Sequence, residues 1–351
     1  MIASLLKLFI PTASAFFVGM AMTPIVTHYL YKHELWKKRP GKIAPDGRAT
    51  PIFNELHKHK EVGTPRMGGI IIWLSTLLVT ILFVLIPDIW PNSVFGKMNF
   101  LSRNQTWLPL FTLVVASLVG LVDDFLQIRG VDSAKAGLSF TKRAVVVIIL
   151  GLIGGWWFYA KLGMTSILIP FLGSLEIGVL IIPLFIATML FLFSSGVVDG
   201  LDGLSGGIMT TIFTAYAGIA FFQNQIDLAV LCGVIAGATL AFLWFNIPPA
   251  RFYMSETGIL GLTTTLTVVA FLTDSLLVLP IIALPLIVTS LSVMIQLGSK
   301  KFCNGKKVFL VAPLHHHFEA MGWPAYKVVM RYWVISVVVA IIGMIIALVG
   351  R

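Results

Sequence analysis

The chain of 351 residues has little charge for its length. Only 11% of its residues are Asp, Glu, Lys or Arg, and only 15 are acidic, whereas 58% are hydrophobic. Soluble globular domains carry about 25% charged residues, so this composition excludes an ordinary soluble enzyme. The mean hydropathy of +0.95 instead predicts an integral membrane protein.

Cysteine is also scarce. The two cysteines are Cys232, in an apolar run, and Cys303, in a basic loop. They form no CxxC pair, which argues against a disulfide framework and a cysteine metal site. The N-terminal segment has a single Lys7 and no clear small-residue cleavage pattern, so it is expected to be a first membrane span and not a removed signal peptide.

Long apolar runs are abundant, and most approach the roughly 20 residues that a helix needs to cross a bilayer. They predict an all-α integral membrane protein with about ten transmembrane helices, forming one domain over residues 1–351. The cytoplasmic loops are expected at about 31–67, 123–143, 199–204, 246–256 and 299–328. The apolar runs cover residues 5–30, 68–87, 105–122, 144–160, 177–198, 204–223, 228–245, 257–273, 275–298 and 329–349.

Basic residues distinguish the two sides of the membrane. With alternating loops, all but five of the 25 Lys and Arg residues fall on one side. The positive-inside rule places that side in the cytoplasm and both termini outside. The net charge of +10 therefore indicates contact with membrane lipids and not with nucleic acid. On the outer side, residues 162–178 have strand-like character around a Gly-Ser turn, which predicts a short extracytoplasmic β-hairpin.

Several of the few acidic residues lie at the cytoplasmic ends of apolar runs. Asp123 and Asp124 follow the third run, Asp199 and Asp202 follow the fifth, and Glu256 precedes the eighth. Ionisable groups at the membrane are functional candidates by default, and carboxylates suit a hard divalent cation beside phosphate oxygens. The alternatives are a solvated helix end for the first pair, an ordinary loop for the second and a helix cap for Glu256.

Three consecutive histidines, His315, His316 and His317, lie in a loop on the same predicted face. Histidine binds phosphates and metals readily near neutral pH. Because the carboxylates can hold a cation, we interpret the histidine segment as a substrate-binding element and not as a metal cluster. Lys60 is a further candidate for binding a polyanionic substrate, although lipid head groups account for most basic residues on this face.

Several segments together resemble the polyprenyl-phosphate N-acetylhexosamine-1-phosphate transferases and, more closely, their phospho-N-acetylmuramoyl-pentapeptide transferase branch. The Asp-Asp and Asp-Gly-Leu-Asp-Gly motifs are common to the superfamily, whereas Ala-Pro-Leu-His-His-His-Phe-Glu is specific to the muramoyl branch. The segments are residues 63–69, 122–125, 199–204, 245–258, 306–319 and 322–324.

The resemblance implies the transfer of phospho-MurNAc-pentapeptide from UDP-MurNAc-pentapeptide to undecaprenyl phosphate, with lipid I and UMP as products. It also implies a Mg²⁺ cofactor, a homodimer and a location in the bacterial cytoplasmic membrane, with the active site on the cytoplasmic face.

The resemblance also implies roles for individual residues. The catalytic candidates are Asp123, as a base or an orienter of the lipid phosphate, Asp124 and His315. Glu256 stands where the family usually has its metal-binding aspartate. The substrate-binding candidates are Asn246, Tyr253, Asp199, Asp202, Lys60, His316 and His317.

The chain departs from the usual family pattern in three places. Two asparagines are absent before Asp199, Glu256 replaces an aspartate, and Gln127 replaces a lysine. These departures keep an inactive scaffold open as an alternative. A superfamily enzyme that uses UDP-GlcNAc would be expected to lack the histidine loop. A transporter would need ionisable groups near mid-membrane, where the apolar runs have almost none.

Overall fold

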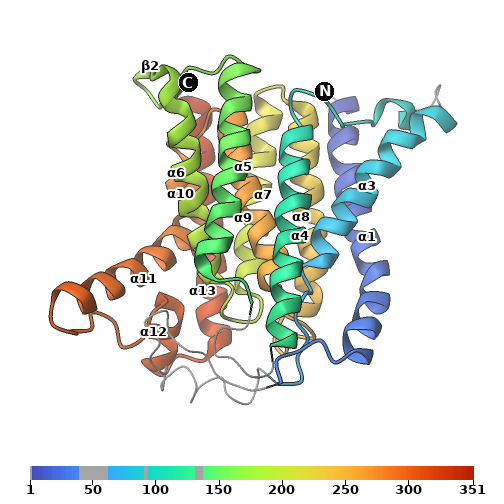
Figure 1. Cartoon of the computed structure of the whole chain (residues 1–351). Helices are drawn as coiled ribbons and strands as arrows, with labels where there is room; N and C mark the ends of the chain where they lie inside the picture. The colour runs from blue at the N-terminus through green and yellow to red at the C-terminus, as the bar shows by residue number, and fades with distance from the viewer. Residues whose placement is uncertain (1, 39–61, 91–93, 131–136) are drawn as a thin grey trace.

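A computed structural model describes residues 2–38, 62–90, 94–130 and 137–351. Long helices stand side by side in a bundle, and the two ends of the chain lie at the same end of it (Figure 1). The first part of the chain forms α1 (Ile2–Lys32), α3 (Ile70–Ile89), the short 3-10 helix η1 (Val94–Lys97), α4 (Trp107–Arg129), α5 (Phe140–Ala160), β1 (Ser166–Ile169) and β2 (Gly173–Glu176).

The second part of the chain is almost entirely helical. Its elements are η2 (Gly178–Leu180), α6 (Ile181–Ser194), η3 (Ser195–Val198), α7 (Leu204–Phe222), α8 (Ile226–Asn246), α9 (Ser255–Leu272), α10 (Leu279–Ile282), α11 (Leu284–Phe302), α12 (Leu314–Ala320) and α13 (Ala325–Val349).

Within the described residues, nine helices are long and apolar enough to cross a membrane. This finding confirms the predicted all-α membrane fold. The ninth predicted run, 275–298, is interrupted, because α10 ends at Ile282 and α11 begins at Leu284. Both helices have a proline in the first turn, where the missing N–H is tolerated and the preceding helix is readily broken. From this break, α11 leans outward from the bundle (Figure 1).

The helices α7, α8 and α9 form the centre of the bundle, since most of their side chains are buried. Helix α4 packs along α9, and α1 packs along α8. Small residues let membrane helices approach closely. At Gly120 of α4, a Cβ atom would overlap the backbone carbonyl of Glu256. The acidic end of α4 is therefore held directly against the first turn of α9.

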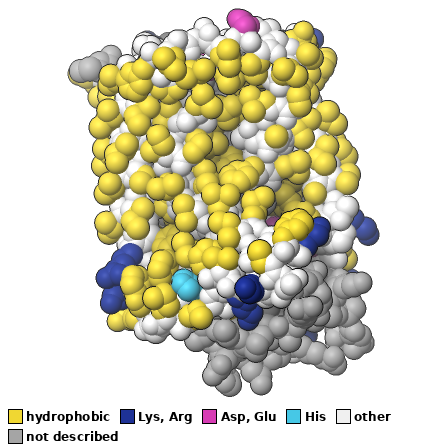
Figure 2. Space-filling model, turned by 90° about the vertical axis from the view of Figure 1, so that its left-hand side faces the viewer, with side chains coloured by type: hydrophobic (Ala, Val, Ile, Leu, Met, Phe, Trp, Pro, Cys, Tyr) yellow, Lys and Arg dark blue, Asp and Glu magenta, His cyan; other side chains and the backbone are white. Residues whose placement is uncertain are grey.

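The surface of the bundle is mostly apolar, as expected for contact with lipid tails. Figure 2 shows hydrophobic side chains over most of the height of one face, with most of its Lys, Arg and His side chains toward the lower end. We call this lower end, where α4 and α8 finish and α5 and α9 begin, the basic end.

The strands β1 and β2 form the predicted hairpin at the opposite end (Figure 1). They are antiparallel, with Ser166 opposite Glu176. The turn lies at residues 170–172, and the Gly-Ser pair begins β2. The carboxylate of Asp274 accepts a hydrogen bond from the N–H of Leu168 at 3.2 Å, which ties the hairpin to the bundle. Burial of this carboxyl group raises the pKa of Asp274.

Candidate functional site

Asp124 lies in the last two turns of α4 and is fully buried. Its Oδ2 accepts hydrogen bonds from the backbone N–H of Thr257 at 2.9 Å and from the Thr257 hydroxyl at 2.7 Å. Thr257 is in the first turn of α9, where backbone N–H groups lack partners within the helix and a negative charge is favourable. Asp124 therefore caps α9 from a neighbouring helix.

Asp123 is also fully buried but has different partners. Its Oδ1 accepts a hydrogen bond from the N–H of Leu138 at 2.5 Å, and its Oδ2 accepts one from Gln127 Nε2 at 2.8 Å. Arg143 Nη1 lies 3.4 Å from the same Oδ2. The difference follows from helix geometry, because adjacent residues point about 100° apart. The two carboxylates thus connect α4 to separate elements of the site.

Two arginines complete this group of charges. Arg143 forms an ion pair with Glu256, in addition to its contact with Asp123. Arg66 Nε lies 3.6 Å from Asp124 Oδ1, and Arg66 Nη1 donates a hydrogen bond to Gln127 Oε1 at 2.5 Å. We call Arg66, Asp123, Asp124, Gln127, Arg143 and Glu256 the carboxylate–arginine cluster. It brings together α4, α5, α9 and the segment before α3.

The arginines are functional candidates that sequence reasoning did not select. Lipid head groups explain most basic residues at this end. The number of Lys and Arg residues therefore does not indicate which of them belongs to the functional site. Arg143 nevertheless has a local signal. It lies in the first turn of α5, where the helix dipole disfavours a cation, and such a position calls for an acidic partner.

The second acidic motif joins the start of α7 to the start of α9. Asp199 accepts hydrogen bonds from the hydroxyl of Ser205 at 2.7 Å and from the N–H of Ser255 at 2.8 Å. Ser255 has a φ of 56°, a left-handed conformation that is unfavourable for most residues. Asp202 accepts a longer bond from the N–H of Ala250 at 3.4 Å. The motif therefore fixes the backbone just before Glu256.

Asn246 and Tyr253 hold loops in place. The Asn246 side chain accepts a hydrogen bond from the N–H of Gly203 and donates one to the carbonyl of Phe252, each at 2.8 Å. The backbone of Tyr253 pairs with Pro65 and Gly68 on either side of Arg66, also at 2.8 Å. In this conformation both polar atoms of the Asn246 amide contact backbone, while the Tyr253 side chain is half-buried.

The three histidines lie on α12. The rings of His315 and His316 are buried, with centroids 4.2 Å apart. His316 Nδ1 lies 2.7 Å from Glu319 Oε2, and His317 Nδ1 accepts a hydrogen bond from the N–H of Leu310 at 3.2 Å. A Cβ atom on Gly200 would meet ring nitrogens of both His315 and His316. The histidine helix thus packs against the 199–204 loop.

The donor chemistry of the cluster fits a hard cation, although the carboxylates already have arginine partners. Asp124 Oδ1 is buried and accepts no hydrogen bond from the described part of the chain. Carboxylate oxygens are the ligands that Mg²⁺ prefers. Across the described ranges, no three His, Cys, Asp or Glu side chains are grouped so that they could hold a metal ion. Lys60 lies outside the described residues.

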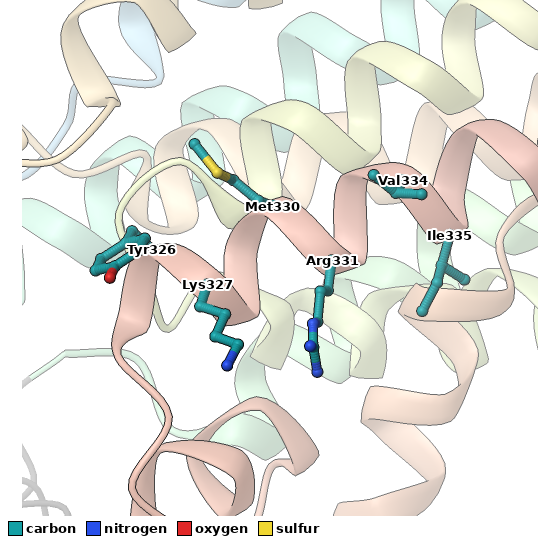
Figure 3. Close-up of a pocket in the computed structure, with 6 residues that line it drawn as sticks. All are labelled: Tyr326, Lys327, Met330, Arg331, Val334 and Ile335. Carbon is teal, nitrogen blue, oxygen red and sulfur yellow. The ribbon is translucent and has the colours of Figure 1, made fainter.

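A shallow groove follows one face of α13 near the basic end (Figure 3). Arg331, which lines the groove, stacks over the Trp323 ring at 4.1 Å from its centroid. On the same helix, Trp333 Nε1 donates a hydrogen bond to the carbonyl of Gly203 at 3.1 Å. This contact ties the grooved helix to the 199–204 loop. The lining residues are Tyr326, Lys327, Met330, Arg331, Val334 and Ile335.

Comparisons with known proteins agree with the motifs. Residues 106–274 match the model of glycosyl transferase family 4. The chain is 32% identical to a phospho-N-acetylmuramoyl-pentapeptide-transferase of Chloroflexus aurantiacus, over 96% of this chain and 88% of that protein. Relatives of the same name from Desulforapulum autotrophicum and Francisella philomiragia are 34% and 32% identical, over 83% and 89% of this chain and 81% and 86% of theirs. The chain therefore belongs to the phospho-N-acetylmuramoyl-pentapeptide-transferase family.

Proposed function

We propose that this membrane enzyme transfers phospho-MurNAc-pentapeptide from UDP-MurNAc-pentapeptide to undecaprenyl phosphate, giving lipid I and UMP. The observation that carries the proposal is the carboxylate–arginine cluster at the basic end of the bundle. Its position suits a reaction between a nucleotide from water and a phosphate at the lipid head-group plane. The relatives named for this transfer match nearly the whole chain.

The chemistry is a displacement at phosphorus. An oxygen of the lipid phosphate attacks the sugar-side phosphorus of the nucleotide, and the bond from that phosphorus to UMP breaks. The electron pair of the broken bond leaves with UMP, and the new phosphorus–oxygen bond gives the pyrophosphate of lipid I. Direct attack needs little covalent chemistry from the protein. The main requirements are positioning and charge stabilisation.

The cluster meets both requirements. Asp123 is held from three directions by Leu138, Gln127 and Arg143, so it is a well-positioned orienter for the lipid phosphate. Arg66 and Arg143 carry the positive charge needed beside a polyanionic substrate, and guanidinium groups suit phosphate oxygens.

The second acidic motif and the histidine helix form the adjoining part of the proposed site. Asp199 and Asp202 hold the backbone before Glu256, while His315 and His316 face the same 199–204 loop. We assign these residues, with Tyr253 and His317, to the substrate side of the site. Asn246 contributes by joining the loops. Lys60 remains a predicted substrate contact.

Glu256, with Asp124 beside it, would hold Mg²⁺. The ion would neutralise charge on the pyrophosphate when bound. Glu256 is the more accessible of the two, because its side chain is 25% exposed whereas that of Asp124 is fully buried. The ion pair with Arg143 must open for Glu256 to turn toward a cation. Arg143 therefore neutralises the negative charge of Glu256 before the metal and the substrate bind.

The groove on α13 is the proposed entry for the lipid substrate. Its apolar residues suit a polyprenyl chain, and Lys327 and Arg331 suit a phosphate head group (Figure 3).

The assembly is proposed to be a homodimer in the bacterial cytoplasmic membrane, with the basic end in the cytoplasm.

A membrane assay with UDP-MurNAc-pentapeptide, undecaprenyl phosphate and Mg²⁺ tests the function by scoring lipid I and UMP. A parallel assay with UDP-GlcNAc tests the second candidate, a transferase for another sugar nucleotide. We expect product only with the muramoyl substrate. Folded protein that forms no lipid I would refute the proposal and support an inactive scaffold.

A further inference from the structure

Gln127 links two charged groups of opposite sign. It lies one turn after Asp123 on α4, so both side chains share a helix face. Its amide nitrogen donates a hydrogen bond to Asp123 Oδ2 at 2.8 Å, while its amide oxygen accepts one from Arg66 Nη1 at 2.5 Å. The two polar ends of the amide therefore match a carboxylate on one side and a guanidinium on the other.

Arg66 is held by a second contact and by its backbone. Its Nε donates a hydrogen bond to the hydroxyl of Ser255 at 3.3 Å and lies 3.6 Å from Asp124 Oδ1. The flanking residues Pro65 and Gly68 pair with the backbone of Tyr253. The side chain is 20% exposed, so the guanidinium lies at the border between the buried carboxylates and solvent.

A lysine at position 127 would be incompatible with this arrangement. Its ammonium group has only donors, so it could bind Asp123 but could not accept the Arg66 hydrogen bond. It would also place two cations side by side in a partly buried site, which is electrostatically unfavourable. A cation at 127 and a cation at 66 are therefore alternatives, and this chain has Arg66 with a neutral Gln127.

We infer that Arg66 supplies, from the segment before α3, a positive charge to the carboxylate pair, and that Gln127 positions the Arg66 guanidinium between Asp123 and Asp124. Gln127 is thus a positioning residue for the transfer, acting through Arg66, and this role rests on the proposed function. A neutral amide at 127 is therefore part of the charge arrangement of the site.

A charge-exchange cycle tests the inference with wild type, Arg66→Gln, Gln127→Lys and the double variant. Thermal unfolding in detergent without substrate is the first measurement. Gln127→Lys is expected to lower the Tm when Arg66 is present and to have little effect when residue 66 is glutamine. Equal Tm changes in both backgrounds would overturn the inference, and this measurement does not depend on the identity of the substrate.

Lipid I formation is the second measurement. Arg66→Gln and Gln127→Lys are each expected to lower kcat by about tenfold or more, since each disturbs a charged hydrogen bond. The double variant should regain most of that loss. Arg66→Lys keeps the charge and should retain more activity than Arg66→Gln. The inference would be overturned if the fold loss of kcat in the double variant equalled or exceeded the product of the fold losses in the two single variants. Equal kcat losses in Arg66→Lys and Arg66→Gln would also overturn it.

The control is Arg129→Gln, which removes an exposed charge from the same end of α4. Arg129 contacts the Phe125 ring and lies outside the cluster. Its kcat and Tm should stay close to wild type. If wild type itself makes no lipid I, the proposed function fails, while the Tm cycle still decides whether Arg66 and Gln127 are coupled.

Discussion

Individual residues at the site differ in how far the sequence could indicate their roles. Asp123, Asp124 and Glu256 are identifiable because acids are rare in an apolar chain and these three lie at helix ends. Their partners are not identifiable in the same way. Arg66 is 61 residues from Gln127, and Arg143 is 113 residues from Glu256. Such long-range side-chain contacts depend on helix packing, which hydropathy does not encode.

Replacing Glu256 with alanine tests the metal assignment. The change removes a carboxylate and leaves Arg143 beside Asp123 without its second partner. Turnover should fall by about 100-fold or more, as is typical when a group that stabilises transition-state charge is removed. Lipid I formation at saturating Mg²⁺ is the measurement. The matched control is Glu176→Ala in exposed β2, which should behave as wild type. Wild-type rates for Glu256→Ala would disprove the metal assignment.

At the scale of helices and loops, hydropathy is informative about spans and much less so about breaks. The runs predicted at 228–245 and 329–349 correspond to α8 and α13 within a few residues, because the bilayer sets their length. The run 275–298 fails as a single span because prolines near 280 and 285 permit a second helix to start in a new direction. The mean hydropathy of the run does not indicate that change of direction.

The close contact between α4 and α9 predicts that Gly120 does not tolerate a larger side chain. Gly120→Ala would force the start of α9 away from α4, because the new methyl group meets the Glu256 carbonyl and the Thr257 nitrogen. Overpacking of this kind typically costs about 1–3 kcal/mol. We expect a lower Tm and a reduced kcat, measured on the same detergent-purified sample. Gly298→Ala in α11 is the control, since nothing lies within 4 Å of its added Cβ, and a similar effect there would contradict the packing argument.

The contact between the 199–204 loop and the end of α8 depends on Asn246. Asn246→Ala leaves the N–H of Gly203 and the carbonyl of Phe252 without their side-chain partner. Each buried group left unpaired costs about 1–3 kcal/mol, so the Tm should fall clearly. Thermal unfolding of Asn104→Ala, an exposed asparagine, provides the comparison. If Asn246→Ala lowers activity with an unchanged Tm, direct substrate binding would replace the loop-joining role.

The native cysteines can show which side of the membrane the basic end of the molecule faces. Cys232 is buried in α8, whereas Cys303 is exposed between α11 and α12, in a loop that also contains Lys306 and Lys307. The positive-inside rule places that loop in the cytoplasm. A membrane-impermeant maleimide should therefore label the chain in inside-out vesicles and leave it unlabelled in intact spheroplasts. Cys303→Ser should abolish the labelling of inside-out vesicles. Labelling in intact spheroplasts that disappears in Cys303→Ser would invert the topology and place the carboxylate–arginine cluster on the wrong side for a cytoplasmic nucleotide.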